Sequence, residues 1–270
     1  TTKKGKKDSP MSFNYTGSFS YSTPIKNVDV LSADEFRSAV TERYPNQTGL
    51  LGDVSTDWQD EIYQNAFGMD HNVSVAGDLQ GLPYRISLGY TGEDGILKTD
   101  NMKRTTASVA LNPVLFDDHL KVNFNLKFVN VKNEFADRGA IGAALQYDPT
   151  KPIESDKVYN PYYTNDVDGD GTADTILMPP TDFGGYYAWI QSNGTDIPVE
   201  QGSSNPVALL NMREDVSNVN RVITNLQLDY KFHFLPDLRA NLNLGLDQSN
   251  SNGDVKVPDY APWVYDALTG

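Results

Sequence analysis

Leu120-Lys-Val-Asn-Phe-Asn-Leu-Lys-Phe128 alternates strictly between apolar and polar side chains. Leucine, valine and phenylalanine take the even-numbered positions, and lysine and asparagine take the odd-numbered ones. Because successive side chains of an extended strand point to opposite faces, this stretch predicts a β-strand with one apolar and one polar face.

The same alternation recurs along the chain, in residues 13–21, 84–90, 225–232 and 238–247. Arginine, lysine, asparagine, glutamine and aspartate occupy many of the polar positions. Such side chains suit a wide, water-filled lumen, whereas the apolar positions suit lipid. Transmembrane β-strands need about 9–11 residues with this period, which is about the length of these stretches. The pattern favours a membrane β-barrel, with a soluble all-β protein as the alternative.

The composition excludes several classes of protein. The chain has 270 residues, 39% of them hydrophobic, and its mean hydropathy is −0.48. No stretch approaches the ~18 consecutive apolar residues of a membrane helix. The absence of cysteine excludes disulfides and thiolate metal sites. The formal net charge of −14 argues against a basic groove, so we expect no nucleic-acid partner.

The predicted strands are 12–22, 71–76, 84–91, 103–112, 120–134, 221–234 and 238–248. Long connections at 23–70 and 136–218 alternate with short turns such as 77–83 and 235–237. Outer-membrane barrels have short periplasmic turns and longer extracellular loops, so the alternation favours a transmembrane barrel and places the basic connector 1–10 on the periplasmic side. Because such barrels have an even number of strands and lipid tolerates no open sheet edge, we expect a part of a larger barrel.

Helical structure is expected within the first long connection. Ser32 is followed three residues later by Glu35, which is the spacing of a capping box. A helix over about 33–43 should therefore form before Pro45. The stretch 57–63 is interpreted as a helical turn or an irregular aromatic patch.

Two neighbouring stretches carry the most specific resemblance to a known family. Thr56-Asp-Trp-Gln-Asp-Glu-Ile-Tyr63, followed by His71-Asn-Val-Ser-Val-Ala-Gly77, resembles the SusC/RagA-like TonB-dependent outer-membrane transporters of Bacteroidetes. Further stretches that resemble this family are 1–6, 30–37, 90–97 and 205–209. The resemblance covers about 1–250 and is least typical at 136–204.

The resemblance implies an antiparallel barrel of roughly 22 strands plugged by an N-terminal domain, of which this chain supplies about seven strands. It assigns 1–10 to the end of the plug domain and its linker, and 11–270 to the N-terminal part of the barrel. It implies a location in the outer membrane of Gram-negative Bacteroidetes, in contact with lipid. It also implies a SusD-like surface lipoprotein as partner, energy from TonB through a region preceding Thr1, and import of oligosaccharides or peptides.

The stretch Asp166-Val-Asp-Gly-Asp-Gly-Thr-Ala-Asp174 predicts a calcium loop. Carboxylates stand at relative positions 1, 3, 5 and 9 of an EF-hand-type loop, namely Asp166, Asp168, Asp170 and Asp174. Gly171 stands at position 6, where the sharp turn lies. Leu177 replaces the bidentate glutamate of position 12, so a distant carboxylate or backbone carbonyls would complete the site. The alternative is an acidic, solvated turn.

The long connection 136–218 is both acidic and aromatic. It holds 13 Asp and Glu against 4 Lys and Arg, a balance that most often marks a solvated surface. Aromatic rings beside carboxylates and amides suit sugar binding, contact with a partner protein, or packing of the loop on itself. The candidate ligand or partner residues are Tyr162, Tyr163, Tyr186, Tyr187 and Trp189.

The remaining polar and aromatic positions have structural interpretations. The tyrosines expected at the membrane–water interfaces are Tyr15, Tyr84, Tyr90 and Tyr230. The side chains expected to line the lumen are Arg85, Lys121, Lys127, Asp229, Lys231 and Arg239. The three histidines are too scattered in sequence to suggest a metal set. No phosphate loop, nucleophile elbow or HExxH motif is present, so we expect no enzyme and no cofactor apart from the predicted calcium.

Three functions remain open at this point. The preferred one is part of a TonB-dependent nutrient importer. The second is a calcium-dependent, surface glycan-binding β-protein without transport, whose apolar strand faces would pack into a soluble core. The third is a passive porin or adhesin barrel without energy coupling.

Overall fold

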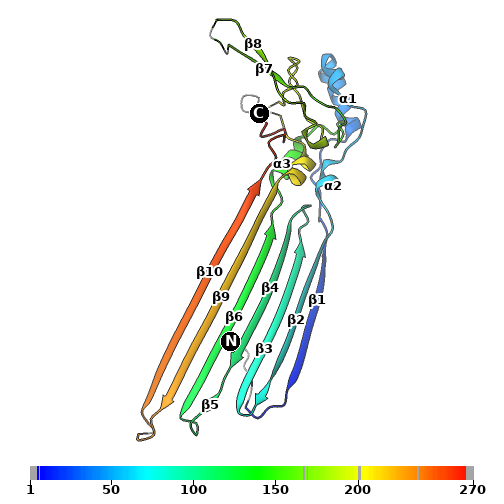
Figure 1. Ribbon diagram of the computed structural model, residues 1–270. Coiled ribbons are helices and arrows are strands. Elements are labelled where there is room, and N and C mark those ends of the chain that lie inside the picture. Colours follow the sequence, from blue (N-terminus) through cyan, green and yellow to red (C-terminus); the bar gives the residue numbers. More distant parts are fainter. Residues whose placement is uncertain are drawn as a thin grey trace.

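One antiparallel sheet dominates the computed structural model, which describes residues 5, 7–166, 168, 170–199, 202–235 and 237–265. Across this sheet the order is β1 (Ser12–Ser22), β2 (Ala66–Leu79), β3 (Leu82–Asp94), β4 (Asn101–Leu111), β6 (Leu120–Glu134), β9 (Glu214–Lys231) and β10 (Arg239–Lys256), with the short β5 (Val114–Leu115) paired to β6. Each long strand pairs with the next one in the chain, so the sheet is a meander (Figure 1). The predicted antiparallel all-β fold is confirmed.

The connections differ in length at the two ends of the sheet. Figure 1 shows the turns of the β2–β3, β5–β6 and β9–β10 pairs at one end, and the long connections gathered at the other. The N-terminal connector lies at the short-turn end, where the backbone N–H of Asp78 donates to the carbonyl of Ser9 at 3.1 Å. Residues 1–4 and Lys6 of the predicted plug end lie outside the described residues. The predicted alternation of long and short connections is therefore confirmed.

Cross-strand register extends the two faces of β6 over the whole sheet, because directly opposed residues share a face. Phe124 is paired with Leu111 of β4 and with Leu226 of β9, and Leu226 is paired with Leu244 of β10. On the other face, Asn125 is paired with Ala110 and Asn225. The sheet thus has one continuous apolar face and one continuous polar face.

The apolar face is a band of limited height. On β6 it ends at Phe128, since the next residues on the same face are polar: Asn130, Lys132 and Glu134. Asn130 donates to the side chains of Asn218 and Asn220 at 2.7 and 2.9 Å, so this upper part of the face is held by amides. The predicted interface tyrosines lie on the apolar face by register, and Tyr84 and Tyr90 bracket Ile86 and Leu88 on β3.

Several strands extend further toward the long connections than the sequence predicts. β2 begins at Ala66 rather than residue 71, and β9 begins at Glu214 rather than residue 221. β10 continues to Lys256, where a loop was expected from Asn250. In β9 and β10 the physical reason is that polar side chains interrupt the alternation there, while the backbone ladder between the two strands continues. In β2 the added residues include Phe67 and Met69, which pair with Tyr21 and Phe19 of β1.

The long connections contain short helices. α1 (Ala33–Arg43) agrees with the prediction and has its capping box, in which Ser32 N–H donates to Glu35 Oε2 at 2.8 Å and Glu35 N–H donates to Ser32 Oγ at 3.4 Å. That bonding lowers the pKa of Glu35. The other elements are η1 (Pro45–Leu50), α2 (Trp58–Ile62), α3 (Gly139–Gln146), β7 (Tyr162–Asn165), β8 (Asp174–Leu177), η2 (Phe183–Gly185) and α4 (Pro206–Met212).

No helix among the described residues is both long and apolar enough to span a membrane.

α3, α4 and the β7–β8 hairpin were not predicted from the sequence.

A charge on the apolar face should destabilise the sheet far more than the same charge on the polar face. Phe124→Lys places an ammonium in the middle of the apolar band, and we expect a loss of about 2–4 kcal/mol in lipid. Asn241→Lys is the control, because this residue is exposed on the polar face opposite Asp229, and the change should cost little. Urea unfolding of the receptor in lipid vesicles measures both, and equal losses would contradict the assignment of faces.

Candidate functional site

The polar face of the sheet carries all the side chains predicted to line a lumen. They share this face by register: Arg85, Lys121, Lys127, Asp229, Lys231 and Arg239. Arg239 Nε lies 3.2 Å from Asp229 Oδ1, and Arg221 Nε donates to Asp247 Oδ1 at 2.8 Å. The face is therefore charged and internally paired along β9 and β10.

Hydrogen bonds between neighbouring strands order the polar face on the β2–β4 side as well. Arg104 Nη2 donates to Thr91 Oγ1 at 3.0 Å, and that hydroxyl donates to Asp70 Oδ2 at 2.7 Å. Arg85 Nη2 donates to Ser74 Oγ at 2.8 Å. These contacts hold long polar side chains against the polar face of the sheet.

The two long connections pack together into one layer above the sheet. Trp58 and Ile62 of α2 are buried against Ala140 of α3, Leu210 of α4 and Leu97. Removing such side chains from water drives this association, because each contributes on the order of 1.5–3 kcal/mol on full burial. We call this assembly the loop layer, comprising the described residues of 23–65, 95–100, 135–161, 178–213 and 257–265.

A turn at 148–151 fastens the second connection to the first. Trp58 Nε1 donates to the carbonyl of Asp148 at 3.0 Å, and Thr56 Oγ1 donates to the carbonyl of Lys151 at 2.7 Å. Lys151 Nζ donates to the carbonyl of Leu50 at 2.6 Å and lies 4.7 Å from the centre of the Trp189 ring. The stretch 56–63, which carries the family resemblance, thus holds the first and second long connections together. We call its contacts with the turn 148–151 the clasp.

Burial changes the proton affinity of the groups in this clasp. Desolvation lowers the pKa of Lys151, and the charge of Asp148 acts in the opposite direction. Desolvation also raises the pKa of Tyr147, and it raises the pKa of Tyr187 to about 12. Both phenols are therefore neutral hydrogen-bond donors at ordinary pH, and the Tyr147 hydroxyl donates to the carbonyl of Tyr187 at 3.2 Å.

The predicted ligand residues divide into two groups. Tyr187 and Trp189 pack against the buried cluster of the loop layer, and Tyr186 accepts a hydrogen bond from Asn211 Nδ2 at 3.0 Å. Tyr162 and Tyr163 instead belong to the β7–β8 hairpin, which projects from the layer (Figure 1). The structure therefore does not bring the five residues together. It gives Tyr186, Tyr187 and Trp189 a packing role.

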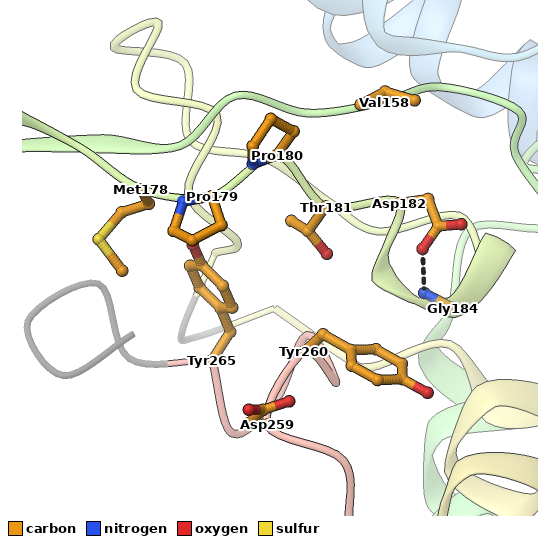
Figure 2. A pocket seen from close by; sticks show the side chains of 10 residues that line it. All are labelled: Val158, Met178, Pro179, Pro180, Thr181, Asp182, Gly184, Asp259, Tyr260 and Tyr265. Atoms are coloured by element: carbon orange, nitrogen blue, oxygen red, sulfur yellow. Dashed lines mark hydrogen bonds between the residues drawn. The ribbon is translucent and has the colours of Figure 1, made fainter.

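Two cavities adjoin the C-terminal part of the loop layer. One of about 410 Å³ is lined by aromatic rings, among them Tyr187, Trp189 and Trp263, together with the amide of Asn205. The other, of about 750 Å³, is shown in Figure 2. Tyr265 borders both cavities. Sequence reasoning missed the contribution of 257–265, because that stretch was expected to be a featureless loop.

The larger cavity combines rings with carboxylates. Figure 2 shows Pro179 and Pro180 on one side and Tyr260 and Asp259 on the other. Asp182 Oδ1 accepts a hydrogen bond from the backbone N–H of Gly184 at 2.9 Å. Such a lining can hold an uncharged polar molecule by ring contact and hydrogen bonds.

The predicted calcium loop forms the tip of the β7–β8 hairpin. Ligand atoms of Asp166, Asp168 and Asp170 lie within 4.8 Å of one another, and they are the one such group of three among the described residues. Gly171 has φ +84°, and its N–H donates to Asp166 Oδ2 at 2.9 Å. Asp174 is instead in β8, paired with Asn165. Val167 and Gly169 lie outside the described residues. Calcium binding stays a prediction.

Two of the histidines, which lie far apart in sequence, meet at the short-turn end of the sheet. The rings of His119 and His233 stack with centroids 3.7 Å apart and planes 8° from parallel. His119 Nδ1 donates to the carbonyl of Lys231 at 2.7 Å, and His233 Nδ1 is hydrogen-bonded to the Tyr230 hydroxyl at 2.9 Å. His71 lies apart, against Tyr15. The stacked pair ties two turns together that are far apart in sequence.

Sequence comparison finds close relatives among TonB-dependent receptors. The chain is 41% identical over 264 residues to the TonB-dependent receptor SusC of Bacteroides thetaiotaomicron, a match that covers 97% of this chain and 25% of SusC. The chain is SusC/RagA-like. It is also 34% identical over 109 residues to the TonB-dependent receptor P3 of Formosa agariphila, covering 39% of this chain and 10% of that receptor. No family model matches.

Solved structures agree with this relationship at the level of fold. A chain of the RagAB peptide importer in its closed-closed state superposes with a TM-score of 0.65 at 17% identity, covering 97% of this SusC-like chain and 30% of that chain. The open-open state gives a TM-score of 0.63. This chain spans about a quarter to a third of the length of these relatives. It corresponds to part of a receptor barrel, and its relatives are receptors and transporters rather than enzymes.

Calcium should bind at the hairpin tip with a dissociation constant on the order of 10⁻⁵ to 10⁻³ M, because the loop lacks the bidentate glutamate of tighter sites. Asp168→Asn should weaken binding strongly. Asp174→Asn is the informative comparison, because β8 holds this residue outside the cluster of three. Calorimetric titration of a β7–β8 loop peptide and of the whole receptor measures both, and heats unaffected by Asp168→Asn would contradict the prediction.

Proposed function

We propose that the chain forms part of the barrel wall and the extracellular loop layer of an outer-membrane TonB-dependent importer. The observation that carries this proposal is the pair of continuous faces on the sheet, one apolar and one charged, in a chain 41% identical to SusC. The apolar face would meet lipid, and the polar face would border the hydrated path of the substrate.

The state of the apolar face favours a membrane over a soluble core. Leu88 is 58% exposed and Leu244 is 53% exposed, and no second layer covers this face within the described part of the chain. A soluble glycan-binding β-protein would leave these side chains in water, at a cost of about 25 cal/mol for each Å² of apolar surface. The exposed face therefore supports the importer against that alternative.

Substrate and partner follow from the family and the loop layer. We propose that the imported nutrient is an oligosaccharide or a peptide, and that a SusD-like lipoprotein sits on the loop layer while TonB supplies energy. The projecting β7–β8 hairpin supports a partner contact, because Tyr162 and Tyr163 are only half-buried there and Leu177 is 77% exposed. Tyrosine and other large side chains are enriched at such interfaces.

Fractionation of the source cells tests this proposal. An antibody to residues 155–180 should stain intact cells and detect an outer-membrane band whose migration changes on boiling. Its mass should be about four times the 29.9 kDa of this chain, since the chain covers 25% of SusC. Replacing residues 162–177 by a short Gly-Ser turn should reduce co-purification of a surface lipoprotein without changing the heat-dependent migration. A soluble band near 30 kDa would contradict the importer.

A further inference from the structure

A hollow of about 460 Å³ opens on the polar face, where β3, β4, β6 and β9 run side by side. Its floor is made of small side chains from neighbouring strands: Ser87, Ser108 and Ala110. The Ser87 and Ser108 hydroxyls share a hydrogen bond of 2.7 Å, which keeps them flat against the wall. The hollow therefore results from small residues at one level of the two adjacent strands β3 and β4.

Two cations border this hollow without a carboxylate. Arg85 donates only to the Ser74 hydroxyl, and Lys127 makes no hydrogen bond or ion pair within the described part of the chain. Both residues belong to the polar face by register. Two positive charges thus lie beside one cavity with no counter-charge from the wall itself.

The neighbouring strands show that the wall does supply counter-charges elsewhere. On β9 and β10, Arg221 is paired with Asp247, and Arg239 is paired with Asp229. The whole chain carries a net charge of −14, so carboxylates are abundant. Lys121 and Lys231 on the same face also make no ion pair in the described part of the chain, so what marks Arg85 and Lys127 is their shared position at a hollow with room for a guest.

An amide at the same cavity also lacks a partner. The side-chain oxygen of Asn125 is buried without a hydrogen bond among the described residues, and Asn125 lines the hollow between Lys127 and Asn225. Buried polar groups are nearly always hydrogen-bonded in folded proteins. The unsatisfied atom is an acceptor, so it can take a hydrogen bond only from an N–H or O–H group of a bound molecule.

We propose that this hollow binds a carboxylate, held by the Arg85 guanidinium and the Lys127 ammonium, while the Asn125 side-chain oxygen accepts from an N–H or O–H of the molecule that carries it. The guanidinium fork matches the two oxygens of a carboxylate, and charge-assisted hydrogen bonds of this kind are strong. The volume exceeds that of a carboxylate alone, so the group is carried by something larger. It is either an Asp or Glu side chain of polypeptide occupying the lumen or a carboxylated solute. The proposal requires only that the polar face encloses a lumen, which is part of the proposed function.

Zero-length cross-linking of the full-length receptor in outer membranes tests the site and separates its sources. A carbodiimide joins an amine to a carboxylate only when they are in contact, and mass spectrometry then identifies the joined peptides. We expect Lys127 to form an amide with an Asp or Glu of the receptor if the source is polypeptide. Lys121 is the matched control, because it has the same side chain on the same strand and face but does not line the hollow. Its cross-strand neighbour is Asp229, so any amide that Lys121 forms should join it to that residue and to no other part of the receptor.

Acylation of lysine amines tests whether the carboxylate comes from a solute. If Lys127 forms no amide, succinate should slow its acylation on the order of tenfold, because a bound carboxylate holds the proton that the amine must lose. Succinate should leave Lys121 unchanged, and Arg85→Gln should abolish the protection of Lys127. Heat-dependent migration of each variant shows whether the barrel is folded. Equal acylation of Lys127 and Lys121 with and without succinate, together with no amide at Lys127, in a folded receptor would overturn the proposal while leaving the importer intact.

Discussion

Pairing of backbone amides is the constraint on which the rest of this structure depends. In hydrocarbon each N–H and C=O must find a partner within the protein, and strands meet this demand only through neighbouring strands. The ladder from β1 to β10 supplies those partners, and the two-residue period of side chains then gives the sheet its two faces. In the proposed membrane location, the ladder therefore determines which residues would meet lipid and which would meet water.

The loop layer depends on the same ladder. The strands β2, β6 and β9 continue beyond the apolar band. Their ends therefore bring the long connections next to each other. The clasp at Trp58 and Lys151 then joins connections that are 90 or more residues apart in sequence. Packing within the layer uses most of its aromatic rings, and the projecting hairpin and the two cavities remain as surfaces for other molecules.

How much could be predicted varied with the physical signal. β6 agrees with its predicted bounds, since apolar and polar side chains alternate strictly along Leu120–Phe128. The last residues of β10, such as Ser251 and Asn252, carry no alternation and are ordered by pairing with β9, so sequence could not reveal them. α3 and α4 are stabilised by burial within the layer. The His119–His233 stack and the hollow at Arg85 and Lys127 arise from register between distant strands, which no local pattern encodes.

Cysteine scanning along Leu120–Phe128 tests the two-faced sheet most directly. The chain has no cysteine, so each introduced thiol is the chain's only one. In the full-length receptor, embedded in outer membranes, a charged maleimide should label the odd-numbered positions and spare the even-numbered ones, with a period of two residues. Uniform labelling of all positions, or labelling confined to the even-numbered ones, would contradict the assignment of one face to lipid and the other to the lumen.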